Sequence, residues 1–262
     1  DGVFVFFLGN DGHAYAFDGV TPWKLTEVIR TTMESANTAQ LAIACGAYCS
    51  KKNQYVLSFP TGSGTTNDLT VVLDMNLSAI QSDDYNTKVF TKFSGIVPSS
   101  WLEYAETAKA RDLLFCEGAA DSKTYTMYSG TSDNGVAINS YYITKSFSTE
   151  DTERHKRWYE LFVDAYQSGA WLLYLFYATD GQTSFVATTP ATIDLTNPST
   201  LPFTLPHVID AGFIATNNTV YIGDESRYIA IKYQISTLNQ SFRVFKSVLY
   251  FGFSKLRRRY SI

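Results

Sequence analysis

The chain has 262 residues, of which 45% are hydrophobic, 15% aromatic and only 18% charged; charged residues make up roughly 25% of average soluble domains. A chain of this length can bury a substantial core in roughly one or two domains. The formal net charge of −4 excludes a general attraction to nucleic acid, because binding phosphates requires a concentrated positive surface. No apolar run approaches the ~20 residues that span a bilayer as a helix.

A hairpin-like unit repeats near the start of the chain, at residues 3–17, 54–73 and 112–128. Each copy is an apolar run, a short break rich in Gly, Asp, Asn or Ser, and a second run in which large and small side chains alternate. Two such runs around a short break are typical of a β-hairpin. Hairpins that recur roughly every 50 residues have the spacing of blades in a β-propeller. The repeat therefore predicts part of a propeller with four-stranded blades.

A short helix is predicted after the first hairpin. Thr21 is a suitable N-cap, Pro22 takes the first helical position, and Leu25, Val28 and Ile29 follow at helical spacing. We expect this helix to run from Pro22 to about Ala36, in a loop between blades.

Short strands are predicted on both sides of these elements, at 40–48, 54–59, 69–74, 88–93, 113–116, 124–128 and 139–147. Together with the first hairpin they form about two and a half blades, fewer than the four to eight that usually close a ring.

The pattern changes after a polar connector at 148–155. Longer strands are predicted at 158–166, 170–178, 185–188, 208–215, 227–236 and 242–253. The run 171–177 is apolar at nearly every position, as in a strand covered on both faces. Residues 190–206 contain four prolines and predict a long loop.

The fold class expected from these elements is all-β with two domains. Residues 1–149 form the partial β-propeller, with one short helix near the N-terminus. Residues 150–262 form an antiparallel, jelly-roll-like β-sandwich.

Two pairs of adjacent acids, Asp83–Asp84 and Glu150–Asp151, are candidates for glycoside hydrolysis. That reaction needs two carboxyl groups about 5 to 10 Å apart across a cleft. Neighbouring residues in an extended loop point apart, so we interpret both pairs as solvated loop acids. No catalytic residue is predicted.

Three glycine-containing segments resemble ligand motifs only superficially. Gly62–Gly64 lacks the Lys-Ser/Thr ending of a phosphate-binding loop and joins two predicted strands, so it predicts a hairpin turn. Asp11-Gly12 and Asp180-Gly181 predict turns without the ligand spacing of a calcium loop. We therefore predict no cofactor and no metal site.

The chain has three cysteines, Cys45, Cys49 and Cys116. Because this number is odd, they cannot all pair in disulfides within the chain. Cys45 and Cys49 fall on one strand, too far apart to bridge. The histidines that a metal site would need are scattered, at His13, His155 and His207. Buried free thiols are the prediction.

Two basic segments could be taken for nucleic-acid sites, residues 154–159 and 255–259. We interpret the first as the entry to a strand with cations solvated at its edge, and the second as a solvated tail. Direct nucleic-acid binding is not expected, and neither is a membrane partner.

Several segments carry a resemblance to a known family. They are residues 6–19 with 23–29, 53–57 with 67–74, 131–138, 141–145, 156–164 and 227–229. In these segments the chain resembles the propeller-containing tail and head-to-tail structural proteins of tailed bacteriophages. The resemblance implies a structural role in a tail tube, nozzle or head–tail adaptor. Its partners would be other copies in a ring and neighbouring tail or connector proteins, in a virion assembled in the host cytoplasm.

We therefore expect a virion structural protein and not an enzyme. The candidate contacts of the assembly are the loop 190–206, the helix 22–36 and the basic tail 255–259, each on grounds of exposure. The chain begins without Met, so we expect an excerpt or a processed product of a longer protein.

Two alternatives stay open. One is a carbohydrate- or receptor-binding module in which Trp101, Trp158 or Trp171 stacks on a sugar face. The other is a glycosidase-like enzyme that uses Asp83 or Asp84.

Overall fold

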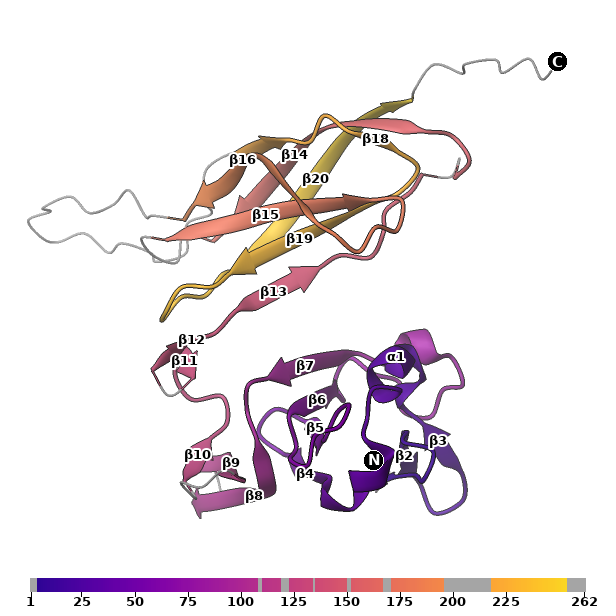
Figure 1. Ribbon diagram of the computed structural model, residues 1–262, viewed down its shortest axis with the longest axis vertical. Helices are drawn as coiled ribbons and strands as arrows, with labels where there is room; N and C mark the ends of the chain where they lie inside the picture. The colour runs from indigo at the N-terminus through magenta and orange to yellow at the C-terminus, as the bar shows by residue number, and fades with distance from the viewer. Residues whose placement is uncertain are drawn as a thin grey trace, which may run out of the picture. The chain divides into compact units, whose positions relative to one another are not determined.

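The computed structural model describes residues 4–107, 110–118, 123–133, 135–149, 152–166, 171–195 and 218–253. The predicted all-β class is confirmed: one short α-helix accompanies several antiparallel sheets (Figure 1). The chain divides into two compact units, Asp1–Ser129 and Gly130–Ile262. No helix in the described ranges is long and apolar enough to cross a membrane.

The first unit contains three antiparallel sheets, each formed by strands that follow one another in the chain. The first sheet joins β1 (Val5–Leu8), β2 (Ala14–Phe17) and β3 (Pro22–Lys24). The second joins β4 (Cys45–Cys49), β5 (Gln54–Phe59), β6 (Leu69–Asp74) and β7 (Phe90–Ser94). The third joins β8 (Pro98–Thr107), β9 (Ala110–Glu117) and β10 (Thr124–Thr126). Over the described residues these sheets do not close a propeller.

The three predicted hairpins are confirmed as the pairs β1–β2, β5–β6 and β9–β10. Side chains on successive residues of a strand point to opposite faces, and β5 and β6 bury both faces. Phe59 and Leu73 enter one hydrophobic cluster, whereas Val56 and Val72 enter another, together with Phe115 of β9. These shared clusters hold the second sheet against its neighbours in the chain.

The helix predicted after the first hairpin begins later than expected. The residues of β3 pair with β2 instead, and a 3₁₀ turn at Thr26–Ile29 and the helix α1 (Arg30–Met33) follow. The cause is Asp18, whose carboxylate accepts hydrogen bonds from the backbone N–H groups of Val20 (2.9 Å) and Thr21 (2.8 Å). The resulting turn directs the chain back along β2.

Two further predictions in this unit need correction. The strand predicted at 40–48 begins later than expected. Its second half lies in β4, but residues 40–43 belong to a 3₁₀ helix, Thr38–Ile43, which begins where the Asn37 side chain accepts a bond from the N–H of Ala39 (3.2 Å). The long strand β8 was not predicted at all, although it pairs with β9 along most of its length.

The second unit contains a small hairpin, β11 (Ser132–Asp133) and β12 (Val136–Ala137), and one larger antiparallel sheet. The strands of the larger sheet are β13 (Ser140–Ile143), β14 (Lys156–Ala165), β15 (Leu172–Thr179), β16 (Val186–Asp194), β17 (Asn218–Tyr221), β18 (Glu225–Ser226), β19 (Ile229–Ile235) and β20 (Val244–Phe253). Pairing follows the order β13-β19-β15-β16-β17-β14, and β18 and β20 pair with opposite sides of β14.

One hydrophobic core lies against most strands of this sheet. Alternate residues of β14, β15 and β19 are buried, among them Leu161, Leu175 and Ile231. The outer face of β15 is less covered than predicted, because Tyr174 and Phe176 are half-buried. Strands from distant parts of the chain thus share one apolar interior.

Two boundaries in the second unit differ from the sequence prediction. The predicted domain boundary lay at 149/150, but β13 pairs with β19, and the second unit begins at Gly130. The predicted loop 190–206 begins inside β16, which continues to Asp194; the rest of that loop after residue 195 and the predicted strand 208–215 lie outside the described residues.

Candidate interaction site

The sheet of the second unit has two unpaired edges. Within the described residues β13 pairs only with β19, and β20 pairs only with β14. Such edges present a row of backbone N–H and C=O groups that can pair with another strand. Each edge therefore offers a place for another chain to add.

The register of β13 shows which backbone groups point outward. The N–H of Thr144 donates to the carbonyl of Ile231 at 2.9 Å, in register with the β13–β19 pairs. In an antiparallel ladder the bonded positions alternate. The backbone groups of Tyr141 and Ile143 therefore face away from β19.

Large side chains accompany both edges. Tyr141 and Tyr142 on β13 are 55% and 60% exposed, and Tyr250 and Phe253 on β20 are 53% and 48% exposed. Aromatic side chains are enriched where proteins meet, because they bury large areas and Tyr keeps a polar tip. These two edges combine hydrogen-bonding backbone with apolar surface.

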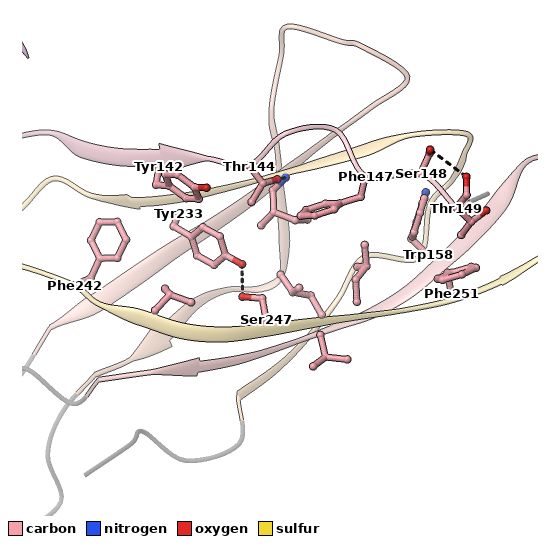
Figure 2. Close-up of a pocket in the computed structure, with 15 residues that line it drawn as sticks. Tyr142, Thr144, Phe147, Ser148, Thr149, Trp158, Tyr233, Phe242, Ser247 and Phe251 are labelled. Carbon is pink, nitrogen blue, oxygen red and sulfur yellow. Dashed lines mark hydrogen bonds between the residues drawn. The ribbon is translucent and has the colours of Figure 1, made fainter. Parts of the chain in front are cut away.

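Both edge strands also line one cavity of about 680 Å³. Figure 2 shows Tyr142 and Thr144 on one side of it and Ser247 of β20 on the other. The aromatic lining residues are Tyr142, Phe147, Trp158, Tyr233, Phe242 and Phe251. The aliphatic lining residues are Leu161, Ile231, Val244, Val248 and Leu249. The remaining ones are hydroxyl residues, so none of the described lining side chains is charged.

A side-chain hydrogen bond joins β19 to β20 across this cavity. The hydroxyls of Tyr233 and Ser247 lie 2.6 Å apart, and either can be the donor (Figure 2). Tyr233 is 3% exposed, and burial raises the pKa of its phenol. The phenol therefore stays neutral and available for hydrogen bonding at physiological pH.

The tryptophans proposed for sugar stacking are held by the protein itself. Trp158 is 1% exposed, and its indole N–H donates to the Ser226 hydroxyl at 2.7 Å. The indole of Trp101 donates to the Ser58 hydroxyl at 3.0 Å, and that of Trp171 donates to the Ser241 carbonyl at 2.9 Å. Only Trp158 belongs to the cavity, where it forms part of the wall.

The predicted acid pairs are not brought to the cavity. Asp83 and Asp84 are exposed in the first unit, and the Asp84 carboxylate accepts a bond from the N–H of Asn86 at 3.0 Å to cap a short 3₁₀ turn. Glu150 and Asp151 lie outside the described residues.

Four carboxyl groups of the described residues have shifted pKa values, and each pKa is lowered, which favours the charged form. They are Asp11, Asp18, Glu27 and Glu103. A general acid requires the opposite shift. Over the described residues, no group of three or more His, Cys, Asp or Glu side chains could hold a metal ion.

The predicted turns are confirmed. Gly62 and Gly64 belong to the connection between β5 and β6, where Gly62 has a φ of 57°. Gly12 and Gly181 also have positive φ, 78° and 75°, which a glycine adopts at no steric cost.

The basic segment 154–159 differs from its prediction in one residue. Lys156 was expected at a solvated edge but is 0% exposed. Its ammonium donates to the carbonyls of Arg154 (3.1 Å) and Arg227 (3.2 Å). Side chains alternate between the two faces of β14, and Lys156 falls on the inner face. Its side chain is long enough for the ammonium to reach these carbonyl acceptors. The tail 255–259 and His207 lie outside the described residues.

The cysteines are free, as predicted, but they are not all buried. Cys49 is buried, Cys45 is partly exposed and Cys116 is exposed. Burial raises the pKa of the Cys45 thiol to about 11, despite a hydrogen bond from the Asn67 side chain that acts in the opposite direction.

Sequence reasoning missed the two free edges. The sequence predicted a strand at 242–253 without its pairing partners, and β13 was assigned to the other domain. Only the pairing partners of these strands reveal which edge is free.

Comparisons with known proteins give no family. No family model matches the chain, and no curated protein matches it. One similar solved structure is described as a glycoside hydrolase; it is 11% identical, has a TM-score of 0.22, and the match covers 94% of this chain and 70% of that one. A TM-score this low supports neither a shared fold nor a shared activity.

Proposed function

We propose that the protein is a structural component of a bacteriophage virion, in a tail tube, nozzle or head–tail adaptor, and that it acts through protein–protein assembly and not as an enzyme. The observation that carries the proposal is the pair of free edges, β13 and β20, at the two ends of one sheet. On this proposal the consecutive-strand sheets of the first unit are blades of a partial propeller, and the second unit is a β-sandwich.

The free edges favour an assembling protein for an energetic reason. A long exposed strand with apolar side chains associates indiscriminately unless another chain covers it. β20 has ten residues, and Phe245, Tyr250, Phe251 and Phe253 on it are 39% to 53% exposed. Neighbouring copies in a ring would cover this surface.

The two alternatives have less support. A sugar-binding module would need an exposed aromatic platform at the proposed tryptophans, but each of these indoles donates to a partner within the protein. A glycosidase would need two facing carboxyl groups, and Asp84 is engaged in capping a turn.

The test is to add a charge to each edge and measure assembly. Ile143→Lys and Tyr250→Lys change residues that are 41% and 53% exposed, so the fold should tolerate them, whereas a lysine on an edge opposes strand addition. The matched control is Val136→Lys, because Val136 is 66% exposed in the same unit but lies on β12. Mass is measured by analytical ultracentrifugation, and particles are inspected by negative-stain electron microscopy.

We expect closed rings with a central channel for the unmodified chain and for Val136→Lys. The double variant should sediment as a folded monomer. Dispersed monomers of the unmodified chain at micromolar concentration, or rings that form equally well with both edge lysines, would reject the proposal.

A further inference from the structure

We propose that the cavity of the second unit is a binding site for an uncharged, largely apolar small molecule that carries one polar atom. The proposal does not depend on the assembly role, since all of the cavity's lining residues lie in one unit.

The size and lining of the cavity favour this class of ligand. Its volume of about 680 Å³ lies within the roughly 300–1,000 Å³ of small-molecule sites, which are mostly apolar with a few placed polar groups. Water in such a space needs two to four polar partners per molecule, and the walls formed by Leu161, Ile231 and Val248 offer none. An apolar occupant therefore gains from displacing water.

The Tyr233–Ser247 pair supplies the polar contact. Two hydroxyls carry two hydrogens, and the bond between them uses one. The other hydrogen and the unused oxygen lone pairs can serve a ligand hydroxyl or carbonyl. A ligand whose one polar atom contacts these two hydroxyls would use their remaining hydrogen-bonding capacity. It would not break the bond that joins β19 to β20.

The lining discriminates against charged amphiphiles. None of its described side chains is charged, so a carboxylate or ammonium that entered would lose its hydration without gaining a partner of opposite charge. A fatty alcohol should therefore bind better than the fatty acid of equal chain length.

The experiment uses the full chain and the neutral dye Nile red. Dye fluorescence is titrated to saturation, and bound dye is then displaced by 1-decanol or by decanoate at pH 8, where the acid is ionised. We expect one dye per chain and displacement by decanol at a concentration at least about 10-fold lower than for decanoate.

Three variants locate the site. Val244→Trp adds bulk to a lining residue and should weaken dye binding at least about 10-fold, whereas Val186→Trp, on β16 and 50% exposed, should leave it unchanged. Ser247→Ala removes one hydroxyl of the polar pair at an exposed position. It should weaken the binding of decanol, measured by dye displacement, about 3- to 10-fold, the effect of one neutral hydrogen bond. Circular dichroism and melting curves confirm that each variant is folded.

Several results would overturn the proposal: no saturable binding to the unmodified folded chain, equal loss in Val244→Trp and Val186→Trp, or equal displacement by decanol and decanoate. Binding by monomers that vanishes in the assembled form would also overturn it, because a neighbouring copy would then occupy the cavity. The ring-assembly test above uses different variants and a different readout, so the two proposals can fail separately.

Discussion

The indole N–H of Trp158 lies 2.7 Å from the Ser226 hydroxyl, and that hydroxyl donates in turn to the carbonyl of Tyr228 at 2.8 Å. Both side chains are 1% exposed. This relay fixes β14 against β18 and the start of β19 at one end of the apolar cavity. Trp158 is therefore part of the frame of the second unit, which explains why a tryptophan of the predicted sugar-stacking set is buried.

Replacing Trp158 by Phe should lower the free energy of unfolding by about 1–3 kcal/mol, because the Ser226 hydroxyl loses its buried donor and the smaller ring leaves a void. Urea unfolding followed by circular dichroism measures the change. Trp171→Phe is the matched control, since that indole donates to a carbonyl in an exposed setting and its loss should cost less. An equal cost for both variants would contradict the structural role of the relay.

Lys88 has a comparable role in the first unit. It is 3% exposed, and its ammonium donates to the carbonyls of Ala79 and Ser82, both at 2.7 Å. Burial lowers the pKa of this lysine, although Asp84 and Asp83 act in the opposite direction.

Lys88→Met should lower the free energy of unfolding by about 2–3 kcal/mol, because two carbonyls lose a charged donor. Chemical denaturation of the variant gives the value, and limited proteolysis should show faster cleavage between residues 78 and 88. Lys92→Met is the control; Lys92 is exposed, so its change should stay within about 0.5 kcal/mol. If both variants unfold at the same urea concentration, Lys88 does not hold this loop.

Local patterns in the sequence predict the hairpins well. The pair β5–β6 matches its predicted bounds, because both strands are apolar and Gly62, which has a positive φ, permits a turn in the loop between them. The pairs β1–β2 and β9–β10 follow the same rule. In each case the turn and both strands lie close together in the chain, so pairing is decided locally.

Elements that depend on distant partners could not be predicted. β8 begins at Pro98 and carries Ser, Glu and Thr among its apolar residues, so its strand character comes from pairing with β9. The free edges and the cavity are further cases, because they follow from the order of strands brought together from residues 140 to 253. No local pattern encodes that order.

Asp18 should make the stability of the first unit depend on pH. Hydrogen bonds to the Asp18 carboxylate hold its pKa well below its usual range. The largest effect comes from the backbone N–H of Thr21, followed by the Trp23 indole and the backbone N–H of Val20. A lowered pKa in the folded state gives stability that is present above the unfolded pKa of about 3.9 and is lost as the pH falls through the folded value.

Asp18→Asn should therefore unfold more readily than the unmodified chain at pH 7, and the difference should shrink as the pH is lowered below about 4. Melting temperatures of both proteins between pH 2 and 7 test this. Asp83→Asn, a change at an exposed acid, serves as the control and should follow the unmodified chain. A gap between Asp18→Asn and the unmodified chain that stays constant down to pH 2 would refute the linkage.

The three thiols should differ in reactivity. Cys116 is exposed, Cys49 is buried, and burial raises the pKa of the Cys45 thiol to about 11. The thiolate is the reactive form, so iodoacetamide at pH 8 should label one cysteine of the native protein, and mass spectrometry of its peptides should identify Cys116. Denaturation in urea should make all three reactive.

Cys116→Ser should abolish the rapid labelling of the native protein, whereas Cys45→Ser should leave it unchanged. Cys45 lies beside Asn67 and Pro98, and the Asn67 amide donates to the Pro98 carbonyl at 2.7 Å. Rapid labelling of Cys45 in the native protein would mean that this partly buried region opens readily in solution. In that case the clusters that join the second sheet of the first unit to its third sheet would be less tightly packed than the burial of Val56 and Val72 indicates.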